Sequence, residues 1–295
     1  MTERTGAVFD LGYKPYEGQR LGRSGAIRTI IKDGFRRVLG LRRKARKKVY
    51  PWSLVAIAFL PAAVFVGLAF FIGDFIPEAD SPFGGHAEYI ALTGAIVLLF
   101  VALAAPELLI PDREEGVLAV YSSRPITAWD YILARAGSLF AVVAAFVLVP
   151  NLLMYIGFAA LDSRGLASAL VGNVDDLLKI VAAMLAYIVG YGAPALLIAT
   201  YATRTGPAAG TFLALMFGSA AFAEAFQRID FVGARFGTLL ALIQHPEVVR
   251  DWVFDQRPTS APTAAGFEPW ASAVVILLIA GLAALLMHRR YRSEL

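Results

Sequence analysis

Six long apolar stretches constrain this chain more than any other feature of its sequence. Each is near the roughly 20 residues that a helix needs to cross about 30 Å of hydrocarbon, and the runs are continuous rather than alternating. They fall at about residues 52–72, 89–111, 136–160, 178–200, 207–225 and 270–288. Because lipid offers no water to backbone polar groups, such runs predict helices. The sequence therefore predicts an all-α integral membrane protein with six transmembrane helices.

The composition excludes an ordinary water-soluble enzyme. Of the 295 residues, 58% are hydrophobic and 17% charged, whereas soluble domains have about half and about a quarter. The chain has no cysteine, which excludes disulfides, thiolate metal sites and cysteine catalysis. Its three histidines, His86, His245 and His288, lie far apart in the sequence, so we expect no zinc site and no histidine-based hydrolase site.

The distribution of basic residues predicts the orientation in the membrane. The first fifty residues hold 14 of the 27 Lys and Arg residues and only four acidic ones. With the N-terminus inside, the inner segments hold 21 basic residues and the outer segments hold six. Because basic loops stay on the cytoplasmic side, we expect both termini in the cytoplasm. The expected location is the cell (inner) membrane.

The N-terminal part divides into a predicted cytoplasmic tail, residues 1–25, and a basic amphipathic segment, residues 26–50. Apolar residues from Ile27 to Leu39 recur at helical spacing, with basic residues on the other face. This pattern predicts an elbow helix in the membrane interface, with its apolar stripe in the acyl boundary. The expected interface anchors are Arg36, Arg37, Arg42, Arg43, Lys47, Lys48 and Trp52. The alternative is a solvated basic tail; nucleic-acid binding is poorly supported, because the neighbouring membrane accounts for the charge.

The inner loop between the second and third spans contains strong local signals. Its acidic start, which includes Asp112, favours the N-terminus of a short helix with an apolar face. Pro125 should end that helix, and Thr127 is expected to be the N-cap of the next one, with Asp130 at its third position. The sequence therefore predicts a short cytoplasmic helix, a turn and a helix running into the third span, a unit suited to dock on a soluble partner.

The residues of this loop carry a family resemblance. A turn from Glu115 to Leu118, an Arg-Pro-Ile-Thr element from Arg124 and a Tyr-Ile-Leu-Ala-Arg lead into the third span resemble the transmembrane permease subunits of type 2 ABC transporters. The resemblance implies a coupling helix that rests on the ATPase subunit. The residues that it assigns to this contact are Glu114, Glu115, Gly116, Leu118, Tyr121, Arg124, Pro125 and Asp130. It also implies short re-entrant outer helices before the last span, within residues 229–254.

The function implied by the resemblance is a permease subunit of an ABC exporter. Residues 51–295 would form its six-span permease domain, paired with a second copy or a similar permease in the lipid bilayer. The chain has no Gly-x-x-x-x-Gly-Lys-Ser/Thr loop, so we expect it not to be an enzyme, and we expect ATP and Mg to be bound by separate ATPase subunits. The alternative function is a membrane anchor or assembly protein without a transport path.

Polar and aromatic residues inside the predicted spans are candidates for a translocation path. They are Asn151, Tyr155, Tyr187 and Tyr191. The alternative for these side chains is hydrogen bonding between helices. Ionisable residues are nearly absent at this depth, which counts against a proton- or sodium-driven carrier.

Overall fold

The chain folds into a bundle of long helices. A computed structural model describes residues 21–41, 46–75, 85–229, 231 and 233–294, without the side chains of 46, 47 and 72–75. In these ranges every regular element is a helix, and six are long and apolar enough to cross a membrane. These six are α2 (Arg46–Phe75), α3 (His86–Glu114), α5 (Ala128–Leu161), α7 (Val174–Tyr201), α8 (Thr205–Gln227) and α11 (Trp270–Tyr291). The predicted all-α class and six spans are confirmed, and the chain is a multi-pass membrane protein.

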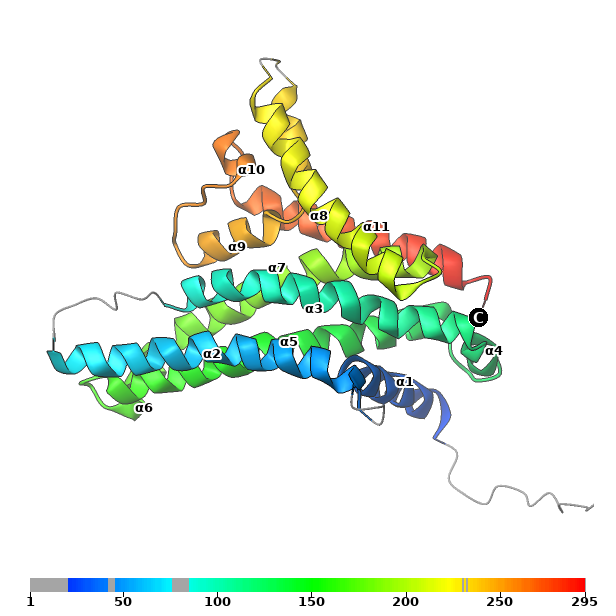
Figure 1. Ribbon diagram of the computed structural model, residues 1–295, viewed down its shortest axis with the longest axis horizontal. Helices are drawn as coiled ribbons and strands as arrows, with labels where there is room; N and C mark the ends of the chain where they lie inside the picture. The colour runs from blue at the N-terminus through cyan, green and yellow to red at the C-terminus, as the bar shows by residue number, and fades with distance from the viewer. Residues whose placement is uncertain (1–20, 42–45, 76–84, 230, 232, 295) are drawn as a thin grey trace, which may run out of the picture.

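Helices α3, α5 and α7 form the centre of the bundle, and α2, α8 and α11 lie at its periphery. Helix α7 packs against α3, α5, α8 and α11. The central helices contribute most of the buried apolar side chains, such as Phe100 and Tyr191, whereas the outer helices expose Leu60, Phe217 and Leu278. In Figure 1, α2, α3 and α5 run alongside one another, while α8 packs on α3 obliquely and diverges from it toward its C-terminal end. Exposed apolar side chains on the outer helices are what contact with lipid requires.

The N-terminal helix α1 (Gly22–Val38) packs against α5 and also contacts α3. Ile30 is buried and shares an apolar cluster with Ile126 and Ala134. The stripe expected in the acyl boundary therefore packs on protein, because α5 begins eight residues before the predicted span and supplies an apolar face there. The predicted segment 26–50 is also divided, since α1 and α2 are separate helices.

The corner between α3 and α5 has the predicted order of short helix, turn and helix, with α4 (Val117–Ser122) as the short helix. The Thr127 N–H donates to Asp130 Oδ2 (2.8 Å) and the Asp130 N–H donates to Thr127 Oγ1 (3.3 Å), so the predicted N-cap is confirmed. The prediction that the acidic residues begin the short helix was wrong, because α3 continues through Asp112, which lies in its last turn. Gly116, at φ +67°, ends α3 in the left-handed conformation that glycine adopts without strain.

Shorter helices lie at the end of the bundle opposite α4 (Figure 1). Helix α6 (Leu166–Gly172), between α5 and α7, was not predicted. The long segment after α8 contains the 3-10 helix η1 (Ala234–Leu240), α9 (His245–Val253) and α10 (Ala261–Ala264). Helix α9 packs against α7 and α11. Helices are thus present where re-entrant helices were predicted, and their depth in a membrane stays a prediction.

Candidate functional site

The α4 corner presents a solvent-exposed surface at one end of the bundle (Figure 1). Five of the eight residues predicted to contact an ATPase subunit are exposed there, namely Glu114, Glu115, Gly116, Arg124 and Pro125. Val120 projects from the middle of α4 with 58% of its surface exposed, and Trp129 is exposed at the start of α5. Carboxylates, a guanidinium and apolar side chains therefore share one surface, as in protein docking surfaces.

The other three predicted contact residues attach the corner to the bundle. Leu118 is buried in the main apolar core, and Tyr121 is half-buried beside it. Asp130 is buried and accepts two hydrogen bonds from the guanidinium of Arg23 in α1, at 2.9 and 2.8 Å. Leu118 and Tyr121 therefore face the bundle and Asp130 faces α1, so the outer surface of the corner is made by their neighbours.

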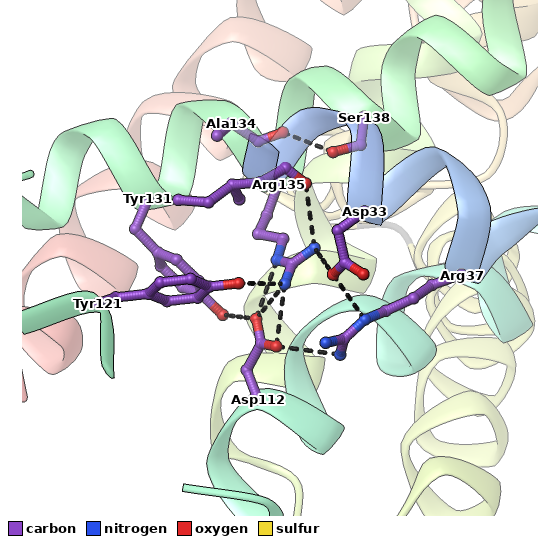
Figure 2. A network of polar contacts seen from close by, with 9 residues as sticks. Asp33, Arg37, Asp112, Tyr121, Tyr131, Ala134, Arg135 and Ser138 are labelled. Atoms are coloured by element: carbon purple, nitrogen blue, oxygen red, sulfur yellow. Dashed lines mark hydrogen bonds and ion pairs between the residues drawn. The ribbon is translucent and has the colours of Figure 1, made fainter. Parts of the chain in front are cut away.

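Behind α4 lies a buried network of charges that the sequence did not predict (Figure 2). The side chains of Arg135 in α5 and Asp112 in α3 are both 0% exposed. Arg135 Nε donates to Asp112 Oδ2 and Arg135 Nη2 donates to Asp112 Oδ1, each at 2.9 Å. Bidentate pairs of this kind are strong and directional. Because removing charges from water is costly, such a pair persists only where partners surround it.

Helix α1 supplies the second half of this network. Asp33 Oδ2 accepts a hydrogen bond from Arg135 Nη1 (3.1 Å) and pairs with Arg37 Nε (2.8 Å). Arg37 Nη1 in turn lies 3.0 Å from Asp112 Oδ1. Two carboxylates and two guanidiniums thus alternate in a closed ring without formal net charge. This ion ring, made of Asp33, Arg37, Asp112 and Arg135, joins α1, α3 and α5.

Two tyrosines connect the ion ring to α4 and α11. Tyr131 donates its hydroxyl proton to Asp112 Oδ2 (2.8 Å), and its ring centroid lies 4.9 Å from that of Tyr291 in α11. Tyr121 of α4 accepts a hydrogen bond from Arg135 Nη2 (3.3 Å). Burial raises the pKa of Tyr121, so its hydroxyl stays protonated at neutral pH. The corner helix is therefore attached directly to the ring.

Further contacts reach the ends of α7 and α11. The guanidinium of Arg113 in α3 donates to backbone carbonyls at the C-terminal end of α7, including that of Ala199 at 2.8 Å. A cation at this position satisfies carbonyls that have no partner in the helix. The Trp129 ring stacks on His288 in α11, with centroids 4.5 Å apart. The α4 corner is therefore linked to four neighbouring helices: α1, α5, α7 and α11.

Only an indirect signal for the ion ring is present in the sequence. The sequence pattern predicts Asp112 at the wrong helix end, and it uses Arg135 as an inner basic residue and as the last residue of the Tyr-Ile-Leu-Ala-Arg element. Each stands directly beside an apolar run, Asp112 after residues 89–111 and Arg135 before 136–160. An ionisable side chain at such a position needs an opposite charge nearby, and Asp112 and Arg135 carry opposite charges. That rule predicts a pair between Asp112 and Arg135. It does not predict that either residue contacts α1.

The side chains predicted to line a path are all buried and hydrogen bonded within the chain. They are Asn151, Tyr155, Tyr187 and Tyr191. The first two lie near His86 at the start of α3, whereas Tyr187 and Tyr191 lie under α9 and its connection to η1. Tyr187 accepts a hydrogen bond from Arg250 Nη1 of α9 (2.9 Å). This geometry fits the alternative of bonding between helices, and the path stays a prediction.

Only some of the predicted interface anchors are among the residues that the structure describes. Those that lie outside the described residues are Arg42, Arg43 and the side chain of Lys47. Lys48 and Trp52 are exposed on α2, and Arg36 is half-buried on α1. Arg37 is engaged in the ion ring, so its guanidinium pairs with carboxylates of the protein.

These features define a class of protein: a multi-pass helical membrane protein with an exposed corner attached to the bundle by a buried ion ring. Among the described residues, no group of three or more His, Cys, Asp or Glu side chains could hold a metal ion. Comparison with protein-family models gives no matching family, and comparison with curated proteins gives no match.

Proposed function

We propose that this chain is the membrane-spanning permease subunit of an ABC exporter, with both termini in the cytoplasm. In this proposal two separate ATPase subunits dock on the α4 corner, and the binding of ATP and Mg draws them together so that they push on it. A second permease, identical or similar, completes the path for the substrate. The observation that carries the proposal is the exposed corner attached through the ion ring to the central helices.

A docking surface transmits force only when it is attached stiffly to the parts that must move. The segment that connects α3 to α5 within the α4 corner is short. It begins at Gly116 and ends at the N-cap of α5. Behind it, the ion ring fixes the ends of α3 and α5 to α1, and Arg113 holds the end of α7. A push on α4 would therefore displace these helix ends together.

The position of the family-like residues also supports the proposal. Glu115, Gly116 and Arg124, which carry much of the resemblance to coupling loops, lie on the exposed side of the corner. Val120 adds an exposed apolar side chain between them. An ATPase subunit could contact all four without any rearrangement of the bundle.

The proposal is tested by purifying the full chain from its membranes in mild detergent and identifying the soluble protein that co-purifies. We expect an ATPase subunit. The variant Val120→Asp places a charge in the docking surface, and it should reduce the recovered ATPase by on the order of tenfold.

The matched control is Val171→Asp, because Val171 is a 76% exposed valine on α6 at the opposite end of the bundle. This variant should recover the ATPase as well as the unmodified chain does. Absence of any ATPase from the unmodified preparation, or equal recovery with both variants, would contradict the proposal.

A further inference from the structure

A cavity of about 360 Å³ is lined by residues of helix ends that lie opposite α4. Figure 1 shows where these helix ends are in the bundle. It lies where the start of α3, the end of α5 and the start of α7 meet the segment that follows α9. Its volume is within the range of small-molecule sites, about 300–1,000 Å³. The side chains that decide its chemistry are His86, Glu88, Tyr155, Phe158, Asp176 and Phe254.

His86 lines this cavity and has one ring nitrogen available as a hydrogen-bond acceptor. The residue is 7% exposed, and its ring Nδ1 lies 3.2 Å from Asn151 Oδ1. Asn151 Nδ2 donates to the Val147 carbonyl (3.0 Å), which identifies Oδ1 as the acceptor atom of that amide. His86 Nδ1 must therefore carry the proton, and Nε2 of the neutral ring has a free lone pair. Nε2 makes no hydrogen bond with any residue that the structure describes.

The charge of the cavity lining is negative. Glu88 and Asp176 contribute carboxylates, and no Lys or Arg is among the described residues that line the cavity. Three basic side chains near the lining are each paired with another carboxylate, Lys179 with Asp255 (3.0 Å), Arg250 with Asp251 (2.5 Å) and Arg164 with Asp162 (2.6 Å). Arg164 Nη2 also donates to Oδ1 of Asn173 (3.3 Å), an uncharged residue of the lining. A ligand that brings a positive charge would therefore meet two carboxylates that these cations do not neutralise by direct contact.

Aromatic side chains form a further part of the lining, beside the amides of Asn173 and Gln256. Tyr155, Phe158 and Phe254 line the cavity, and the His86 ring lies 5.7 Å from the Phe158 ring in an edge-to-face arrangement. Aromatic faces attract ammonium groups and also accommodate the carbon part of a ligand. A bare metal ion fits less well, because the described residues offer no cluster of three metal-ligating side chains.

We propose that this cavity binds a small organic ammonium ion. Its N–H groups donate to the Asp176 carboxylate and to His86 Nε2, while its carbon skeleton packs against Tyr155, Phe158 and Phe254. Glu88 contributes charge from the side of the site, since its oxygens also accept hydrogen bonds from the Gly85 N–H (2.7 Å) and the Gln256 amide (2.6 Å). This site requires no ATPase subunit. The proposal of an ammonium site can therefore be tested separately from the proposed transport function.

The test is calorimetric titration of the full chain, purified in detergent at pH 7.5, with 2-phenylethylammonium. The control ligand is 2-phenylethanol, which has the same carbon skeleton and a neutral hydroxyl in place of the ammonium group. We expect saturable binding of the ammonium ion and affinity at least about tenfold weaker for the alcohol. Equal affinity for the two ligands, or no binding of the ammonium ion, would overturn the proposal.

A pair of neighbouring carboxylates gives the matched variants. Asp176→Asn removes the charge inside the cavity, and it should weaken ammonium binding by about tenfold or more. Asp175→Asn removes a carboxylate whose side chain is 69% exposed and is not part of the lining, so binding should change less than about twofold. Phe254→Leu should weaken binding of both ligands. Unchanged binding in Asp176→Asn, with an unfolding temperature equal to that of the unmodified chain, would contradict the site.

Discussion

The guanidinium of Arg135 in α5 forms a bidentate ion pair with the carboxylate of Asp112 in α3, and neither side chain is exposed. Asp112 lies in the last turn of α3, and Arg135 lies about two turns into α5, on either side of the α4 corner. The pair therefore fixes the separation of the two helix ends from which the corner projects. Asp33 and Arg37 close the ring from α1, so the same contact also holds the N-terminal helix.

Removing one member of this pair should be strongly destabilising. Asp112→Asn leaves Arg135 and Arg37 facing each other with Asp33 as their only carboxylate among the described ring members. Breaking a buried pair in this way costs about 3–5 kcal/mol. We expect a loss of that size in the free energy of unfolding, measured by circular dichroism during denaturant titration in detergent.

Two comparisons make this prediction specific. The double variant Asp112→Leu with Arg135→Met removes both charges and should lose less stability than Asp112→Asn, since Arg37 and Asp33 still neutralise each other. Asp162→Asn breaks the exposed pair with Arg164 (2.6 Å) and should leave unfolding nearly unchanged. If Asp112→Asn were as stable as Asp162→Asn, the ring would not hold the bundle together.

The left-handed backbone at Gly116 predicts a second measurable effect. A Cβ added there meets no atom within 4 Å, so a substitution is opposed by the backbone conformation at φ +67° alone. Gly116→Ala should therefore cost about 1 kcal/mol in the free energy of unfolding, whereas Gly116→Asn should cost less, because asparagine adopts this conformation more readily. Equal stability of the alanine variant and the unmodified chain would show that the corner is built differently.

Acidification should weaken the packing of α9. His245 is buried, with Nδ1 3.0 Å from Ser272 Oγ and Nε2 2.9 Å from the Leu239 carbonyl, and burial lowers its pKa below 6.5. The unfolded chain takes up a proton near pH 6.5, while the folded chain does so only at lower pH. Stability is therefore lost as the pH falls below 6.5 toward the folded-state pKa.

The measurement is the unfolding temperature at pH 7.5 and at pH 5.5. The variant His245→Asn should show a smaller decrease between these values than the unmodified chain. Burial raises the pKa of Glu247 in the same helix, which acts in the opposite direction, so the difference between the two proteins isolates the histidine. An identical pH dependence in both would contradict this assignment.

Much of the architecture could be predicted because it depends on local patterns. Continuous apolar runs are sufficient to locate spans, and all six match helices of the structure. The Thr127 and Asp130 spacing located the start of α5, since a capping box is formed by residues three positions apart. Pro125 predicted the end of the short helix, and α4 ends at Ser122, shortly before it.

What could not be predicted depends on contacts between distant segments. An amphipathic stripe such as that around Ile30 is compatible with lipid or with a protein partner, and only the position of α5 decides between them. Asp33 and Arg37 had the same pattern as solvent-facing charges of an interfacial helix, although both belong to the ion ring. The fold was therefore predictable from periodicity, whereas the ring behind the corner was not.

We propose that the exposed α4 corner transmits work from an ATPase subunit to the bundle. The most direct test of this proposal is the ATP hydrolysis rate of the assembly purified through this chain, before and after combining Glu115→Ala, Gly116→Asn and Arg124→Ala. A matched control combines Asp162→Ala with Arg164→Ala at the opposite end of the bundle. We expect the corner variant to lower the rate by on the order of tenfold while the control retains it. An unchanged rate in the corner variant would contradict the account.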